Sequence, residues 1–443
     1  MWLLGAKDNM SAQIRKRARN SFMKQSQIKT LTSIGKSRSK HGGLIVPVVG
    51  IWILICMLAT VLVIVPAASP ATGAEVADTL RTIVGPQPVA ALESLSFQMQ
   101  DKLHQFLFII SGDKPQISLA NTNAVNLIKP TSPTTPTPRP PTPEPIIIQP
   151  TAAQTATPLP PTATPPPSSD VVSAPPQIGW QAYGPTVNGA PLMAQTMIMI
   201  NPGQSYAGTA LVRIDLSQLQ LHVMAGNLEP AHPSGIAQAI PNLGMVPPQD
   251  YNNLVAAFNG GFKGIHGHYG MMMNEVTLLQ PIDGLATIAL YQDGSVRIGA
   301  WGSDILPSPD MVAFRQNCPP LITAGQFNPA LFNNDRRAWG YSQNSDVTWR
   351  TGVGLSQDGR YLIYAVSNGT TVQDLANAFQ QAGAYNAMQL DINEFYARFV
   401  TYQPDSTQSS GLIAERLLSQ MTNVQSLYLT PSARDFFYLT LRQ

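Results

Sequence analysis

Three groups of polar side chains in the C-terminal half of the chain have the types and spacing that chemistry requires. The first is a glycine-rich loop with two histidines, the second an arginine beside a threonine, and the third a pair of carboxylates around an asparagine. Glycines let a ligand approach backbone N–H groups, an arginine fork pairs with phosphate or carboxylate, and histidines and carboxylates exchange protons. The candidate substrate-binding residues are Asn259, Gly260, Gly261, Lys263, Arg350, Thr351 and Asn393, and the candidate catalytic residues are Asp391, His266, His268 and Glu394.

Each group also has an ordinary structural explanation. An Asn-Gly-Gly sequence is typical of a turn, Arg350 could make a surface ion pair, and Asp391 could cap a helix. A zinc site could be drawn from His266, His268 and Asp391, but the chain has no HExxH motif and no clustered Cys/His spacing. The GxSxG motif of many serine hydrolases is missing as well. We therefore expect no metal and no cofactor.

The order of four motifs resembles the phosphodiester glycosidase family. These are AAFNGGF, PIDG, RTGVGLSQDGRYLIYAV and TVQDLANAFQQAGAYNAMQLD, and the resemblance spans roughly Val255 to Phe399. It implies an α+β fold and hydrolysis of a sugar that is joined through its anomeric carbon to a phosphodiester. By position, residues 259–261 would line the sugar site, Arg350 would hold the phosphate and Asp391 would be the acid at the end of the central strand.

The chain departs from the family pattern at one loop. Where the family has Asp-Gly-Gly-Gly-Ser, this sequence has Asp391-Ile392-Asn393-Glu394-Phe395. Larger side chains there suggest a divergent branch in which a histidine serves as general acid. Two alternatives remain: a non-catalytic surface module that binds glycan or an anionic polymer, and a purely structural surface protein in which Asp391 and Arg350 lie apart.

Hydrophobic periodicity indicates the elements that position these residues. Alternating runs predict strands over 210–216 and 221–224, and a buried strand over 387–390 leads to Asp391. Asp293-Gly294 and Asp358-Gly359 predict two-residue hairpins with type I′ turns. A helix is predicted over 372–382, with Thr371 and Asp374 at its start and Gly383 at its end. The prediction is an α+β domain over 179–443, built on a mixed sheet with few helices.

The charge-free run 44–65 predicts one membrane-spanning helix, since at 1.5 Å per residue it crosses roughly 30 Å of hydrocarbon. The alternative is a cleaved signal peptide, because small residues follow the run at Ala67-Ala68 and Gly73-Ala74. Residues 1–43 carry many Lys and Arg and a single acid, Asp8, which places the N-terminus in the cytoplasm and the rest outside. The basic charge is explained by topology, so we expect no nucleic-acid binding. Cys56 lies inside the predicted span and Cys318 outside the membrane, so the two cannot meet and no disulfide is expected.

The remaining segments connect the predicted span, 44–66, to the C-terminal domain. Residues 67–128 contain a helical apolar seam over 92–110, which could form a weak homodimer or pack on membrane lipid. Residues 129–178 are rich in Pro and Thr and predict a semi-rigid spacer that holds the domain away from the bilayer. The sequence thus predicts a single-pass cell-membrane protein with a C-terminal domain outside that acts on a glycan or sugar-phosphate.

Overall fold

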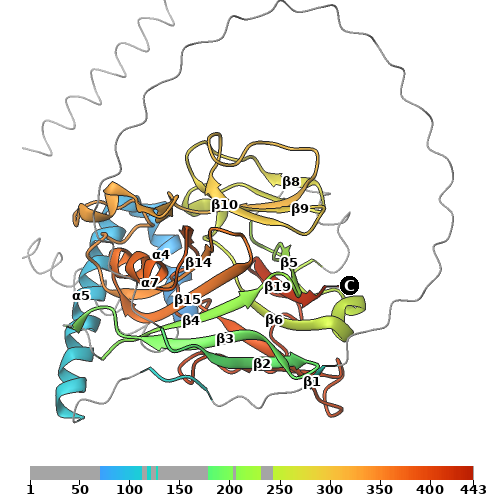
Figure 1. The fold of residues 1–443 in the computed structure, drawn as a ribbon. Helices are drawn as coiled ribbons and strands as arrows, with labels where there is room; N and C mark the ends of the chain where they lie inside the picture. Colours follow the sequence, from blue (N-terminus) through green and yellow to red (C-terminus); the bar gives the residue numbers. More distant parts are fainter. Residues whose placement is uncertain are drawn as a thin grey trace, which may run out of the picture. The chain divides into compact units, whose positions relative to one another are not determined.

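The structure is a computed structural model that describes residues 70–111, 117–120, 126–127, 178–202, 206–230 and 243–442. These residues form three β-sheets with few helices, which confirms the α+β class (Figure 1). The helices are α4 (Pro70–Val84), α5 (Pro86–Ile110) and α7 (Val372–Gln381), with the 3-10 helices η3 (Pro248–Asn253), η4 (Gly264–His266) and η5 (Pro329–Phe332).

The strands are arranged in one large sheet and two smaller ones. The nine-stranded sheet has the order β1 (Asn126–Leu127), β2 (Gln181–Val187), β3 (Ala190–Ile198), β4 (Thr209–Asp215), β15 (Tyr361–Thr370), β14 (Thr348–Leu355), β16 (Asn386–Gln389), β12 (Ile322–Thr323) and β13 (Gln326–Phe327). The second sheet has the order β18 (Leu412–Arg416), β17 (Phe399–Pro404), β6 (Leu254–Asn259), β19 (Phe436–Leu441) and β5 (Leu219–Met224). The third has the order β10 (Val296–Ala300), β9 (Ala286–Tyr291), β11 (Met311–Gln316), β7 (Met271–Met273) and β8 (Val276–Leu279).

The predicted helix over 372–382 is confirmed as α7, which packs on one face of the nine-stranded sheet (Figure 1). Thr371 caps it by accepting a hydrogen bond at 3.0 Å from the Asp374 backbone N–H. Phe379 of this helix lies so close to β14 that a Cβ on Gly352 would meet its ring at 2.9 Å. The glycine in this strand therefore makes room for the helix.

The opposite face of the nine-stranded sheet packs against the second sheet. Side chains of β4 alternate between the two faces, as a period of two requires: Val212 belongs to the core between the sheets and Leu211 to the core under α7. Aromatic rings join the layers, because the ring centroid of Tyr364 of β15 lies 5.2 Å from that of Phe258 of β6 and 5.1 Å from that of Phe399 of β17. This core fixes the ends of β6, β14 and β16 relative to one another.

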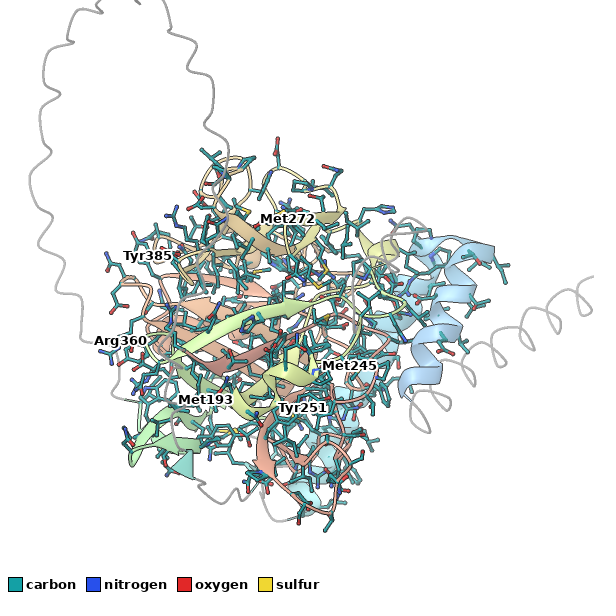
Figure 2. The ribbon with its side chains drawn as sticks, turned by 90° about the vertical axis from the view of Figure 1, so that its right-hand side faces the viewer. Met193, Met245, Tyr251, Met272, Arg360 and Tyr385 are labelled. Atoms are coloured by element: carbon teal, nitrogen blue, oxygen red, sulfur yellow. The ribbon has the colours of Figure 1, made fainter. Side chains whose placement is uncertain are left out.

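Both predicted hairpins exist, but the predicted type I′ turn is wrong. A type I′ turn needs a positive φ at both central residues, and here only Gly294 and Gly359 have one, at 79° and 71°. Each aspartate instead accepts a backbone hydrogen bond two residues on, Asp293 from Ser295 and Asp358 from Arg360. The aspartate side chains thus stabilise longer connections with a single left-handed glycine. Arg360 lies at the edge of the molecule (Figure 2).

Segments on both sides of the Pro/Thr tract belong to the same compact unit. β1 pairs in parallel with β2, and the Ala120 N–H donates at 2.8 Å to the carbonyl of Leu417. The tract therefore links two parts of one folded unit. The predicted tail 1–43, the predicted span 44–66 and nearly all of the tract lie outside the described residues. Within the described ranges, no helix combines the length and apolar composition needed to cross a bilayer.

Candidate functional site

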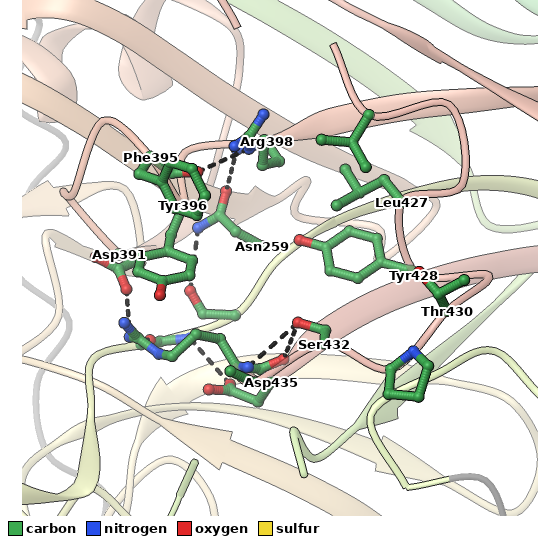
Figure 3. Close-up of a pocket in the computed structure, with 16 residues that line it drawn as sticks. Asn259, Asp391, Phe395, Tyr396, Arg398, Leu427, Tyr428, Thr430, Ser432 and Asp435 are labelled. Carbon is green, nitrogen blue, oxygen red and sulfur yellow. Dashed lines mark hydrogen bonds and ion pairs between the residues drawn. The ribbon is translucent and has the colours of Figure 1, made fainter. Parts of the chain in front are cut away.

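A pocket of about 250 Å³ opens where β6 and β16 end and β19 begins (Figure 3). Four of the predicted site residues line it, namely Asn259, Gly260, Gly261 and Asp391. The rest of the lining comes from Phe395, Tyr396, Arg398, Val424, Leu427, Tyr428, Thr430, Pro431, Ser432, Ala433, Arg434 and Asp435. The structure therefore brings the glycine loop and the strand-end aspartate together, as the sequence predicted.

The backbone of the glycine loop is held by Asp435. The Gly260 N–H donates to the Asp435 carbonyl and the Gly261 N–H to its carboxylate, both at 3.0 Å. A Cβ on Gly260 would lie 2.0 Å from Asp435 Oδ2, so only glycine permits this approach. These N–H groups are consequently used within the protein rather than offered to a ligand.

Asp435 is in turn fixed by Arg315, and both side chains are fully buried. Arg315 Nε donates to Asp435 Oδ2 at 2.8 Å and Nη2 to Oδ1 at 3.2 Å. The same guanidinium donates to the carbonyls of Phe262 at 2.7 Å and Tyr269 at 3.1 Å. A bidentate pair with its remaining donors satisfied gives the loop a defined geometry. Sequence reasoning missed both residues.

Asn259 and Thr351 form a buried network that ends at the strand-end aspartate. Asn259 Nδ2 donates to Thr351 Oγ1 at 2.9 Å, and Thr351 Oγ1 donates to the Asp391 carbonyl at 2.6 Å. Asn259 Oδ1 accepts from the Tyr364 hydroxyl at 2.9 Å. Asn259 and Thr351 therefore use their side-chain hydrogen bonds within the protein, and these bonds position Asp391 and the glycine loop.

Two arginines line the pocket, and Arg434 is the one that pairs with Asp391, while Arg398 donates to the carbonyls of Phe395, at 2.8 Å, and Thr422. Arg434 Nη2 donates to Asp391 Oδ2 and, at 2.9 Å, to the carbonyl of Gly261, while its guanidinium lies 4.6 Å from the centre of the Tyr396 ring. Burial acts to lower the pKa of Arg434, but the charges of Asp391 and Asp435 outweigh this and raise it. The guanidinium thus keeps its charge, and its buried Nε has no hydrogen-bond partner among the described residues.

Two tyrosines also line the pocket. Tyr428 points its hydroxyl into the pocket toward Asn259, and Tyr396 lies beside Asp391 (Figure 3). Burial raises the pKa of the Tyr428 hydroxyl, so the group stays a neutral hydrogen-bond donor. The pocket therefore combines an ion pair, ring faces and a phenol, which can hold a ligand that has both polar and apolar sides.

Arg350 does not line this pocket. It is fully buried and donates to the Thr370 carbonyl at 3.1 Å, to Gln389 Oε1 at 2.8 Å and to the Asp346 carbonyl at 3.1 Å. Burial lowers the pKa of Arg350 to about 10, which still leaves it charged at neutral pH. Its geometry is that of a residue that joins β14, β15 and β16 rather than one that meets a ligand.

The predicted residues after the glycine loop also lie outside the pocket. Lys263 Nζ and His266 Nε2 contact the carboxylate of Asp78 on α4, at 2.7 and 2.8 Å. His268 is exposed, with a positive φ of 52°. On the other loop, Glu394 is exposed, and the Asn393 N–H donates to Asp391 Oδ1 at 2.9 Å while its side chain accepts from the Phe395 N–H.

Comparison with known protein families finds a match for one segment of the chain. Residues 252–391 match the model of the phosphodiester glycosidase family. The resemblance noted in the sequence is thereby confirmed at the level of the family, over this segment, and supports a hydrolase-like enzyme. No curated protein matches the chain. The matched segment ends at Asp391, so Arg434 and Asp435 lie beyond it.

Three solved structures that match the chain have low sequence identity to it. The catalytic domain of zebrafish N-acetylglucosamine-1-phosphodiester alpha-N-acetylglucosaminidase, auto-inhibited by its pro-peptide, has a TM-score of 0.36 and 16% identity, over 60% of this chain and 88% of that one. A hypothetical protein from Synechocystis has a TM-score of 0.31 and 12% identity, over 60% and 64% of the two chains. A putative exported protein from Burkholderia pseudomallei has a TM-score of 0.27 and 10% identity, over 53% and 74%.

Proposed function

We propose that the protein is a membrane-anchored, extracytoplasmic hydrolase that cleaves sugar-1-phosphodiester bonds in surface or cell-wall glycans. The observation that carries this proposal is the pairing of Arg434 with Asp391 in the pocket next to the glycine loop. A phosphodiester needs a cation, and a sugar that leaves through its anomeric carbon needs a nearby carboxylate. The pocket offers both groups within one ion pair.

In the proposed reaction, water attacks the anomeric carbon and the bond from that carbon to the phosphate oxygen breaks. The electron pair of this bond stays on the phosphate oxygen, so the products are a free sugar and a phosphate monoester, and the proton of the attacking water passes to solvent. The guanidinium of Arg434 stabilises the charge on the leaving phosphate, with its free Nε as the added donor. The Asp391 carboxylate stabilises the oxocarbenium-like centre.

The phosphate role is assigned to Arg434 and not to Arg350. The donors of Arg350 are used by acceptors of the protein, and its side chain has no exposed surface. Arg434 lines the pocket and retains an unpartnered Nε. A phosphate that approaches Arg434 would share the guanidinium with Asp391 and leave that carboxylate facing the sugar.

Turnover of alkyl sugar-1-phosphodiesters by the purified full chain tests this proposal. Asp391→Asn and Arg434→Gln are compared with Asp335→Asn and Arg336→Gln, which make the same changes at adjacent exposed positions outside the pocket. Loss of sugar release in the first pair alone supports the assignment. Equal turnover by Asp391→Asn and the parent protein would remove it.

A histidine as general acid is tested in the same assay. His268 is exposed and lies outside the pocket lining, so we expect His268→Ala to retain turnover. A loss of activity in this variant, with unchanged thermal unfolding, would restore the role that the sequence suggested.

A surface module that binds glycan without cleaving it is the second candidate. It is favoured by one observation: the carboxylate oxygens of Asp391 already accept from Arg434 and from the Asn393 N–H. Binding of the same phosphodiesters by the parent protein, with no release of sugar over days, would select this function over hydrolysis.

The anchor is proposed from the charge-free run 44–65 and the basic residues before it. Two measurements on cell membranes test it. Retention of the protein after alkaline carbonate extraction, with the C-terminal domain open to protease added outside, is expected. Release by carbonate would refute the anchor without bearing on the pocket.

A further inference from the structure

Helix α5 exposes an apolar face. Its six most prominent large apolar side chains are each between 51% and 70% exposed, namely Leu95, Met99, Leu103, Phe106, Ile109 and Ile110. Their spacing of three and four residues places them along one side of the helix. Contiguous exposed apolar surface of this kind marks a site of interaction.

The opposite side of α5 is fastened to the folded domain. Ser94 is buried and donates at 2.6 Å to Asp346 Oδ2, and Arg337 Nη1 donates to Ser94 Oγ at 3.2 Å and to the Ala90 carbonyl at 3.3 Å. Nearer the C-terminal end, the Tyr206 hydroxyl donates to Asp101. These contacts fix the helix, so its apolar face is held outward rather than free to turn inward.

Polar side chains on the exposed side fit a lipid headgroup region. From Leu95 to Ile110 the exposed polar residues are Gln98 and Lys102, and no carboxylate in this stretch is exposed. A lysine beside an apolar face can extend its amine to lipid phosphates while its alkyl stem stays in apolar surroundings. An amphipathic helix can lie in the plane of a membrane interface with its apolar side chains among the acyl chains.

The proposed anchor would leave the membrane only a few residues before these helices. The charge-free run ends at Val65, and α4 begins at Pro70. The connection between these residues spans at most about 18 Å when fully extended. The pair α4 and α5 thus starts next to the point where the proposed anchor would leave the membrane.

We propose that the apolar face of α5 rests on the outer leaflet of the membrane that holds the protein. The proposed docking of α5 rests on the membrane anchor in the proposed function, and it does not depend on whether the protein hydrolyses phosphodiesters. It places the folded domain at the membrane surface, because α5 is fastened to that domain and precedes the Pro/Thr tract. The tract then does not set the distance between the bilayer and the pocket.

Photo-crosslinking of the full chain in phospholipid vesicles tests the proposal. A photoreactive phenylalanine replaces Phe106, and the control carries it at Leu306, an exposed apolar residue in the loop after β10. Carbonate extraction of the same vesicles first establishes that the chain is anchored. We expect an adduct with the mass of one phospholipid at position 106 and none at position 306.

Other outcomes overturn the proposal. An adduct of dimer mass at position 106 would show that the apolar face of α5 pairs two copies of the chain. A crosslink from position 106 to residues 44–65 would show that this face packs against the apolar run of the same chain. An anchored protein with no adduct at position 106 would show that the face meets water. A protein that carbonate extracts would refute the anchor and the docking together, while sugar release would still report on the pocket.

A charged variant gives an independent reading. Leu103→Glu combined with Phe106→Glu puts two carboxylates on the face, and since both side chains are exposed we expect unchanged thermal unfolding. With the photoreactive group moved to Met99, the lipid adduct should be lost in this variant. Persistence of the adduct at its original yield would contradict the proposal.

Discussion

Replacing Arg350 should cost stability, because its donors serve only the protein. Arg350→Ala removes the partners of three acceptors: the Thr370 carbonyl and Gln389 Oε1, at 3.1 and 2.8 Å, and the Asp346 carbonyl at 3.1 Å. A buried acceptor without a donor costs about 1–3 kcal/mol. The variant also loses a buried charge that burial itself disfavours, which offsets part of this cost. Three such acceptors together cost about 3–9 kcal/mol, and after the offset the expected net loss in the free energy of unfolding is about 3–6 kcal/mol.

Urea unfolding of the full chain in detergent, followed by tryptophan fluorescence, measures this loss. With a slope of about 3 kcal/mol per molar urea, the midpoint should fall by about 1–2 M. Arg350→Lys keeps the charge but not the fork, so its midpoint should lie between those of the parent and the alanine variant. Sugar release, scaled to the folded fraction, should persist in Arg350→Lys. An unchanged midpoint together with abolished turnover would refute the reasoning, because it would mean that Arg350 contacts substrate.

Three further outcomes follow from the geometry. Gly260→Ala places a Cβ 2.0 Å from Asp435 Oδ2, so calorimetry should show a loss of about 1–3 kcal/mol; an unchanged melting temperature would contradict this. Burial acts to raise the pKa of Asp78, but its bonds to His266 and a lysine outweigh this and lower it. The contribution of the Asp78 carboxylate to the free energy of unfolding is therefore complete above the ordinary aspartate pKa of about 4, and it is lost as the pH falls below that value. Asp78→Asn should speed amide exchange in α4 at least about tenfold at neutral pH, and equal exchange rates would refute the contact. Burial raises the pKa of Cys318 to about 12, so in a variant without the other cysteine a thiol reagent at pH 8 should react only after unfolding.

The elements could be predicted where their signal is local. The apolar run over 210–216 predicted the strand that the structure shows as Thr209–Asp215, and Thr371 with Asp374 predicted the start of the helix. The turn type could not be read from Asp-Gly alone. It depends on the bond that each aspartate makes to the backbone two residues on, as Asp293 does with Ser295.

The sequence pointed only to those pocket residues that stand within recognisable motifs. Asn259 to Gly261 and Asp391 follow strands whose ends meet, and the Asp391 N–H donates to the Gly260 carbonyl at 3.1 Å. The sequence did not point to Arg434, because this residue lies 43 positions from Asp391 and no hydrophobic periodicity connects the two. The one clue is that Arg434 and Asp435, two charges in succession, directly precede the fully buried strand β19.

Burial decided the role of Arg350, and burial is a property of the whole fold. The arginine stands in a motif that resembles a phosphate site, but every residue of its strand β14 is buried. In the same way, the apolar seam of α5 was readable as helical, whereas its attachment through Ser94 and Arg337 depends on residues more than 240 positions away.

The most direct test of the account is the fate of solvent oxygen in the reaction. The enzyme is run on an alkyl sugar-1-phosphodiester in water enriched in ¹⁸O, and the phosphate product is examined by ³¹P NMR. Attack at the anomeric carbon predicts that the label enters the sugar and that the phosphorus resonance of the phosphate monoester shows no isotope shift. Asp391→Asn should form neither labelled sugar nor phosphate monoester. Label in the phosphate monoester would show cleavage of the P–O bond and would contradict a glycosidase.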